Sequence, residues 1–107
     1  MEFTYKNKLF KFNSISENDW IYKCIVESNS FYENDLLKYI YKIRRFINSS
    51  GNTIIDIGAN IGNHAVYFGK YLCEKVIAVE PSQLHSDILR KNLSSNLSKN
   101  KYEVHQI

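Results

Sequence analysis

Two glycines in this 107-residue chain flank the segment best suited to binding a ligand. Gly58 and Gly62 follow a β-branched apolar run and precede a run with helical spacing. A glycine turn between a buried strand and a helix lets a ligand approach the backbone closely. The free N–H groups and the dipole of the helix then point at that ligand. We therefore expect a small-molecule site at this turn.

Two carboxylates stand near the ends of the apolar runs on either side of the turn. Glu80 ends the second run, 22 residues after Gly58, where a carboxylate can accept hydrogen bonds from both hydroxyls of a ribose. A solvated strand end is the structural alternative. Asp56 interrupts the first run, and its burial without a partner would be costly. A ligand ammonium group or the N–H groups of the glycine turn would serve as that partner.

The glycine spacing argues against a dinucleotide site. The G-x-G-x-x-G pattern of nicotinamide and flavin enzymes, laid on Gly58, requires glycine where the chain has Asn60 and Asn63. A nucleotide-dependent oxidoreductase is therefore disfavoured.

Three histidines are candidates for a general base. His64 falls in the first helical turn after the glycines, whereas His85 and His105 are predicted at surface or strand positions. A helix-surface or ligand-edge position is the alternative for His64. No metal site is expected, because Cys24 and Cys73 match no CxxC or CxxH spacing and are predicted to be buried free thiols.

Strands and helices alternate around the turn. Apolar runs predict strands at 53–57, 75–80 and 102–107, and helical spacing predicts helices over 61–72 and 84–93. The order β-α-β-α-β predicts a right-handed parallel α/β unit with helices on its faces. The nearly continuous apolar character of the first strand predicts burial on both of its faces.

The N-terminal segment is predicted to be mostly helical. Loose alternation over residues 2–13 indicates a small hairpin at its start. Helical spacing over 20–25 and 36–47 predicts two helices after it. Ser16 and Asp19 form a plausible capping box before the first of these helices.

Composition and charge exclude several classes of protein. The 44% hydrophobic and 23% charged fractions are those of globular proteins, and no apolar run approaches the roughly 18 residues of a membrane span. The N-terminus has no apolar signal core, so a soluble cytoplasmic protein is expected. A net charge of +3 is far from the excess of a nucleic-acid binder.

Three strings resemble the FkbM family of S-adenosylmethionine-dependent methyltransferases. They are Ile-Ile-Asp-Ile-Gly-Ala-Asn-Ile-Gly-Asn-His from residue 54, Val-Ile-Ala-Val-Glu-Pro from residue 76 and Leu-Arg-Lys-Asn-Leu from residue 89. The match covers roughly residues 52–107. Residues 31–37 more loosely resemble the segment that such proteins place before their helical lead-in.

The resemblance implies a Rossmann-like class I methyltransferase core with strand order 3-2-1-4-5-7-6, truncated here after its third strand. Residues 1–50 would be a helical lead-in and residues 51–107 the first half of the cofactor domain. The implied cofactor is S-adenosylmethionine, and the implied reaction is O-methylation of a sugar or secondary-metabolite hydroxyl. Glu80 would bind the ribose and Pro81 would lie near the adenine. The cofactor-binding residues would be Asp56, Gly58, Ala59, Asn60, Gly62, Asn63, Glu80 and Pro81.

The resemblance also implies that the acceptor pocket and any catalytic base come mainly from strands four to seven, which this sequence lacks. Catalytic residues therefore stay unassigned, and the 53–57 strand should have an unpaired apolar edge. We expect the isolated chain to be poorly stable and catalytically silent. The alternatives are a remnant of a split or truncated gene and a non-catalytic interaction module. The expected partners are a small-molecule or glycan acceptor and an oligomer or complementing chain at the sheet edge, without nucleic acid.

Overall fold

Three parallel strands form the sheet that the apolar runs predict. The computed structural model describes residues 1–47 and 51–107, and in it β3 (Thr53–Ile57), β4 (Lys75–Val79) and β5 (Tyr102–His105) pair in the order β3-β4-β5. The register places Asp56 beside Ala78 and Ile77 beside Glu103. This sheet confirms the α/β class and the part of the strand order that the chain contains.

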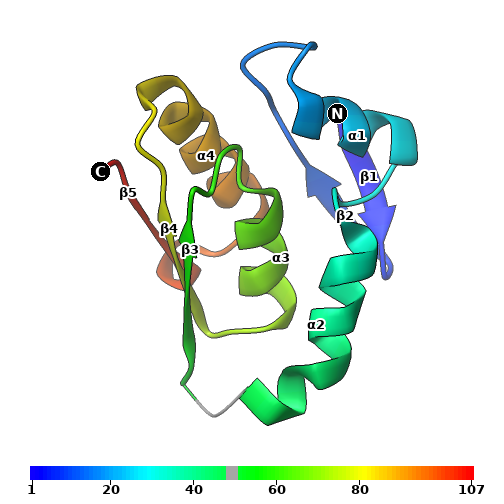
Figure 1. Cartoon of the computed structure of the whole chain (residues 1–107), viewed down its shortest axis with the longest axis vertical. Helices are drawn as coiled ribbons and strands as arrows, with labels where there is room; N and C mark the ends of the chain where they lie inside the picture. The colour runs from blue at the N-terminus through cyan, green and yellow to red at the C-terminus, as the bar shows by residue number, and fades with distance from the viewer. Residues whose placement is uncertain (48–50) are drawn as a thin grey trace.

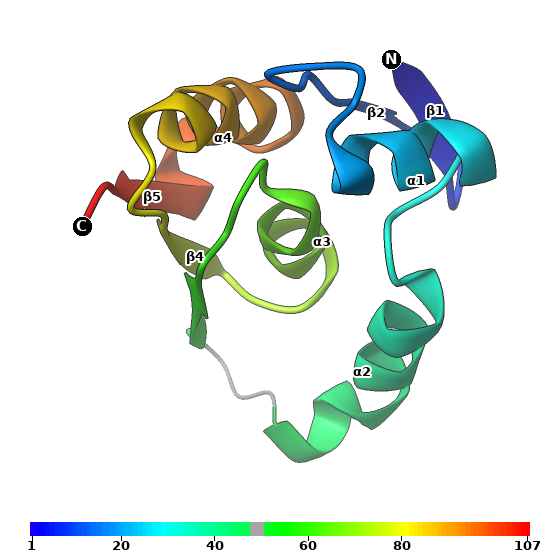
Figure 2. The same cartoon turned by 45° about the horizontal axis from the view of Figure 1, so that its top comes forward.

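Two helices cover one face of this sheet. α3 (Asn63–Tyr71) follows β3, and α4 (Gln83–Asn96) follows β4 and leads through the 3-10 turn η1 (Lys99–Lys101) into β5. Both helices lie on the same side of the strands (Figure 2). The strand residues beneath them, Val76 and Ala78, have no exposed surface. The alternation of β4 therefore directs its apolar side chains under the helices.

The other face of the sheet is open. Ile55 and Ile57 of β3 point away from the helices and are 61% and 80% exposed. Among residues 1–47 and 51–107, no element covers these two side chains. The prediction that this strand is buried on both faces is therefore wrong for the described residues. An apolar run indicates what a strand could bury, and only a packed neighbour decides what it does bury.

The chain begins with a β-hairpin rather than a mostly helical segment. β1 (Glu2–Tyr5) and β2 (Lys8–Lys11) pair antiparallel, with Phe3 opposite Phe10. Lys6 and Asn7 both have positive φ, 48° and 63°, which is the geometry of the tight hairpin turn that matches strand twist. The predicted hairpin over residues 2–13 is thus confirmed. The mostly helical description is wrong at this end, because alternating aromatics favour paired strands.

Two helices complete the N-terminal segment (Figure 1). α1 (Trp20–Ser28) is capped by Asp19, whose Oδ1 accepts a hydrogen bond from the Tyr22 N–H at 2.9 Å. The predicted capping box is therefore wrong, because Asp19 is itself the N-cap and the Ser16 hydroxyl accepts from the Asn18 N–H. α2 (Asn34–Ile47) follows. The predicted boundary after residue 50 adjoins residues 48–50, which lie outside the described part of the chain.

An aromatic cluster joins the hairpin to the sheet unit. Phe31, between α1 and α2, packs edge-on against Phe3 and Phe10 of the hairpin and against Tyr67 of α3. All four rings are at most 3% exposed and belong to one hydrophobic core that also includes the covered strand residues. The N-terminal segment therefore shares its core with the helix-covered side of the sheet.

Two further sequence predictions concern cysteines and membrane spans. Both cysteines are free thiols, as predicted, but only Cys73 is buried. The prediction of burial is wrong for Cys24, which is half-buried. No helix within residues 1–47 or 51–107 is both long enough and apolar enough to cross a bilayer.

Candidate functional site

The glycine turn folds back over the carboxyl end of β4. The N–H groups of Gly58 and Ala59 both donate to the carbonyl oxygen of Val79, at 2.8 and 3.0 Å. Gly58, Asn60 and Gly62 have φ values of 79°, 54° and 96°. These left-handed conformations explain why the turn uses two glycines and an asparagine.

Glu80 ties this turn to the start of α4. Its Oε1 accepts from the Asn60 N–H and its Oε2 from the Ser82 N–H, each at 2.9 Å. The side chain is buried, with 7% of the residue exposed, so the solvated-strand-end alternative does not describe it. Each carboxylate oxygen has a second lone pair for a further donor. Pro81 follows on the surface, and its carbonyl oxygen accepts from Nε2 of Gln106 at 3.3 Å.

The two glycines of the turn meet different surroundings. A Cβ added at Gly62 would lie 2.9 Å from Cδ1 of Leu89, so this glycine allows α3 to begin against α4. A Cβ added at Gly58 would meet no described heavy atom within 4 Å. Gly62 therefore serves packing, whereas Gly58 leaves open space beside the turn.

Asp56 has the least satisfied carboxylate at this end of the sheet. Within residues 1–47 and 51–107, its Oδ2 is buried and has no hydrogen-bond partner. Burial raises the pKa of Asp56, and the nearby His64 partly offsets that rise. The N–H groups of Gly58, Ala59 and Asn60 do not supply the missing donor, because they are bonded to Val79 and Glu80. Asp56 is thus an acceptor that a donor-bearing ligand would satisfy.

Two asparagines hold the N-terminal segment against the site. Asn63, 4% exposed, accepts from the Tyr32 N–H at 2.8 Å and donates to the Tyr32 carbonyl at 2.9 Å. Asn92, fully buried, donates to the carbonyls of Ile61 and Asn13 at 2.7 and 3.0 Å. Asn63 therefore clamps the segment before α2 onto the first turn of α3.

That clamp brings a third carboxylate to the site. Glu33 lies with its Oε1 3.3 Å from Nε2 of His64, at ion-pair distance. The Tyr32 ring stacks on the imidazole at a centroid distance of 6.4 Å. His64 lies in the first turn of α3, as predicted. Sequence reasoning missed Tyr32 and Glu33 as site residues, and the only signal was the loose resemblance of residues 31–37.

The other two histidines have separate neighbours. His85 of α4 places Nδ1 3.0 Å from the Ser82 hydroxyl and Nε2 4.0 Å from Oδ2 of Asp19. His105 is the exposed last residue of β5, with Nε2 3.4 Å from Oε1 of Glu103. In the chain as described, no group of three His, Cys, Asp or Glu side chains is arranged to hold a metal ion.

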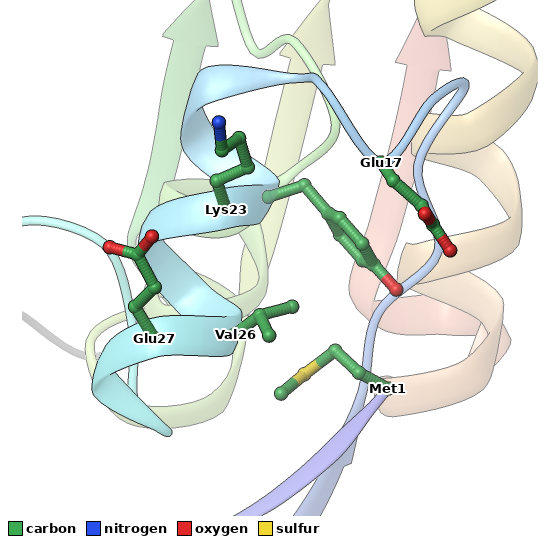
Figure 3. Close-up of a pocket in the computed structure, with 6 residues that line it drawn as sticks. Met1, Glu17, Lys23, Val26 and Glu27 are labelled. Atoms are coloured by element: carbon green, nitrogen blue, oxygen red, sulfur yellow. The ribbon is translucent and has the colours of Figure 1, made fainter.

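Two surface pockets open on the N-terminal segment. The larger, of about 380 Å³, is shown in Figure 3, where the side chains of Met1 and Val26 face each other. The smaller, of about 260 Å³, is lined in part by Tyr32, Glu33 and Asn34, so it adjoins the clamped segment. None of the lining residues of either pocket is among the eight predicted cofactor-binding residues.

Comparison with known proteins finds similarity at the level of structure. No protein-family model matches the chain, and no curated protein sequence matches it. TYW2 from M. jannaschii, solved in complex with AdoMet, aligns over 98% of this chain and 42% of its own, with a TM-score of 0.59 and 21% identity. A Klebsiella pneumoniae protein assigned as an O-methyltransferase aligns over 86% and 45%, with a TM-score of 0.58 and 15% identity.

A Pyrococcus horikoshii protein assigned as an RNA methyltransferase aligns over 67% of this chain and 33% of its own, with a TM-score of 0.55 and 26% identity. This chain thus spans between a third and a half of the length of these structures. The similarity to these three structures is one of fold. The chain is therefore structurally similar to S-adenosylmethionine-dependent methyltransferases of Rossmann-like fold.

Proposed function

We propose that this chain is the cofactor-binding portion of an S-adenosylmethionine-dependent methyltransferase of FkbM type, which methylates a hydroxyl of a sugar or secondary metabolite. The observation that carries the proposal is the buried carboxylate of Glu80, which holds the glycine turn through the Asn60 N–H. The fold similarity supports the general class, and the three sequence strings support the family and the acceptor.

The residues at the turn fit this cofactor. Glu80 has lone pairs left for the two ribose hydroxyls, and Asp56 has an unpaired buried oxygen for an ammonium group. The open space beside Gly58 admits a ligand against the backbone. In the proposal, Ala59, Asn60 and Gly62 shape the surface for the methionine part, Pro81 borders the adenine, and Asn63 acts by positioning Tyr32.

The chemistry of these residues is binding and orientation. The cofactor, when bound, supplies a sulfonium-activated methyl group for in-line transfer. Holding an acceptor oxygen about 3 Å from such a carbon and in line with the leaving atom is worth several kcal/mol, so positioning is the main contribution that we assign to this chain. His64, half-buried beside Glu33, is the candidate base that the described residues offer.

Ligand-dependent thermal stability tests the proposal. We expect 1 mM S-adenosylhomocysteine to raise the melting temperature of the wild-type chain, because a ligand that binds only the folded state stabilises it. Glu80→Gln should lose most of this rise, since an amide accepts fewer ribose hydrogen bonds than a carboxylate. Glu74→Gln is the matched control, because exposed Glu74 precedes β4 and Glu80 follows it. No rise in the wild type, or an equal rise with NAD, would contradict the proposal.

The open face of β3 favours a second candidate function, an interaction module. Ile55 and Ile57 are exposed on a strand that pairs only with β4 in the described sheet. Unpaired apolar strands are templates for pairing with another chain. In this alternative, light scattering after size exclusion should show an oligomer that Ile57→Lys dissociates, without any response to S-adenosylhomocysteine. A monomer at all accessible concentrations would count against the alternative.

A further inference from the structure

The segment before α2 is fixed beside the glycine turn by several independent contacts. Asn63 bonds both backbone groups of Tyr32, as described above. The imidazole of His64 also lies between two rings, with the Tyr32 ring at 6.4 Å and 23° and the Phe68 ring at 6.0 Å and 28°. This segment therefore has one defined position relative to the first turn of α3.

Glu33 is held in an unusual backbone conformation at this position. Its φ is 55°, in the left-handed region that residues with a bulky side chain rarely adopt. Its carbonyl oxygen accepts from the Leu37 N–H at 3.1 Å, so Glu33 also forms the start of α2. The side chain reaches to 3.3 Å from Nε2 of His64. Strained backbone of this kind persists where its surroundings hold it, and it is often found at functional sites.

The polar atoms near Glu33 and the turn lack donors. Of the buried side-chain oxygens that have no hydrogen-bond partner among the described residues, three belong to the start of α2, to β3 or to the glycine turn. They are Oδ1 of Asn34, Oδ2 of Asp56 and Oδ1 of Asn60. Buried acceptors are nearly always satisfied, so each of these oxygens is open to an N–H donor of a ligand. Glu33 lies 3.3 Å from His64, and the same imidazole is near enough to Asp56 to offset part of the rise in its pKa. Two carboxylates near one imidazole favour a cationic ligand over an anionic one.

We propose that Glu33 and Asp56 together receive the primary ammonium group of the cofactor, Asp56 from the sheet and Glu33 from the N-terminal segment. The inference rests on the proposed function and extends it to a residue outside the strand–turn–helix unit. A primary ammonium has three N–H donors and one positive charge, which matches the acceptors and the charge of this cluster. The N-terminal segment is then part of the binding site and not only a cover for the hydrophobic core.

Two ligands, one with and one without the amino acid part that carries this group, separate the inference from the proposed function. S-adenosylhomocysteine has the ammonium group, whereas 5′-methylthioadenosine keeps the nucleoside and the sulfur but lacks the amino acid part. Both should bind the wild-type chain in calorimetric titrations. Glu33→Gln should weaken S-adenosylhomocysteine binding about tenfold, as expected for one charge-assisted hydrogen bond. Its affinity for methylthioadenosine should be unchanged.

Control variants test whether Glu33 acts through contact with the ligand or through the fold. Glu33→Asn should behave as Glu33→Gln does, because asparagine tolerates the left-handed conformation. Glu27→Gln, on the exposed surface of α1, should change neither affinity. Glu80→Gln should weaken both ligands, since both contain the ribose.

The other possible results of these titrations each contradict either the inference alone or the inference together with the proposed function. If Glu33→Gln weakens both ligands equally, or neither, the inference is overturned while the proposed function stands. If the wild-type chain binds methylthioadenosine but not S-adenosylhomocysteine, the ammonium subsite is overturned. If it binds neither ligand, the proposed function and the inference both fail.

Discussion

The two faces of the three-stranded sheet differ more than any other two regions of the molecule. On the face under α3 and α4, Val76 and Ala78 are fully buried. On the other face, Ile55 and Ile57 of the neighbouring strand are mostly exposed. The residue types on the two faces are nearly the same. Burial in this sheet is therefore decided by where the helices lie and not by the hydrophobicity of the strand.

Two carboxylates in the sheet show the same contrast electrostatically. Asp56 shares the covered face with its register partner Ala78, and burial raises its pKa. Glu103 lies on the open face, where its hydrogen bond to Lys75, with Nζ at 2.6 Å, lowers its pKa. The covered face penalises a charge, whereas the open face provides a counter-ion and water. The cofactor site that we propose begins at the charge on the covered face.

Truncation of side chains on the two faces should give the largest difference in the free energy of unfolding. Leu89→Ala, on the covered side, should lower the free energy of unfolding by about 3 kcal/mol, because Leu89 is fully buried and its removal leaves a cavity. Ile57→Ala, on the open face, should change it by less than about 0.5 kcal/mol. Urea unfolding of both variants measures the difference. Equal losses would mean that the open face is covered in solution.

The two glycines of the turn give a smaller and sharper test. Gly62→Ala should cost about 2 kcal/mol or more, since alanine there combines a positive φ with contact to Leu89. Gly58→Ala should cost only about 1 kcal/mol, because the backbone conformation is its single penalty. Thermal unfolding without ligand compares the two. A larger loss for Gly58→Ala would refute the assignment of packing to Gly62 and open space to Gly58.

The smallest expected effect is on the pH dependence of stability, which should have opposite signs for Asp56 and Glu103. The raised pKa of Asp56 means that its contribution to stability is complete below its ordinary value of 3.8 and is lost as the pH rises through its folded-state pKa. Asp56→Asn should therefore be more stable than the wild type at pH 7 and equal to it at low pH.

The lowered pKa of Glu103 has the opposite sign. Its contribution is present above its ordinary value of 4.5 and is lost as the pH falls through its folded-state pKa. Glu103→Gln should be slightly less stable than the wild type at pH 7, with no difference at low pH. Melting curves from pH 3 to 8 measure both variants. The same sign for both carboxylates would contradict the assignment of one covered and one open face.

Most of the fold could be predicted from the sequence. The three strands, the two covering helices and the small hairpin all follow from local periodicity, because alternation and helical spacing are properties of neighbouring residues. The open face of β3 could not be predicted this way, because an apolar run shows which residues a strand can bury and not whether another element covers them. The cap of α1 could not be predicted either, because Ser16 and Asp19 are both cap-forming residues and only the backbone angles show that the helix begins after Asp19.

The candidate site also has a part that could be predicted from the sequence and a part that could not. The glycine turn and Glu80 could be identified because their spacing along the chain reflects one strand–turn–helix–strand unit. Glu33 could not be identified, because it reaches His64 only through the clamp between Asn63 and Tyr32, 31 residues apart. The loose resemblance of residues 31–37 is the only signal in the sequence, and it does not indicate the contact with His64.

The parallel α/β unit, the glycine turn and the carboxylate that follows the second strand can be predicted from the sequence alone, because each depends on residues close together in the chain. The folded structure is needed to show which face of the sheet is covered, which glycine serves packing and which carboxylate lacks a partner. These properties depend on distant segments brought into contact, and burial, charge and hydrogen bonding take their values only from such contacts.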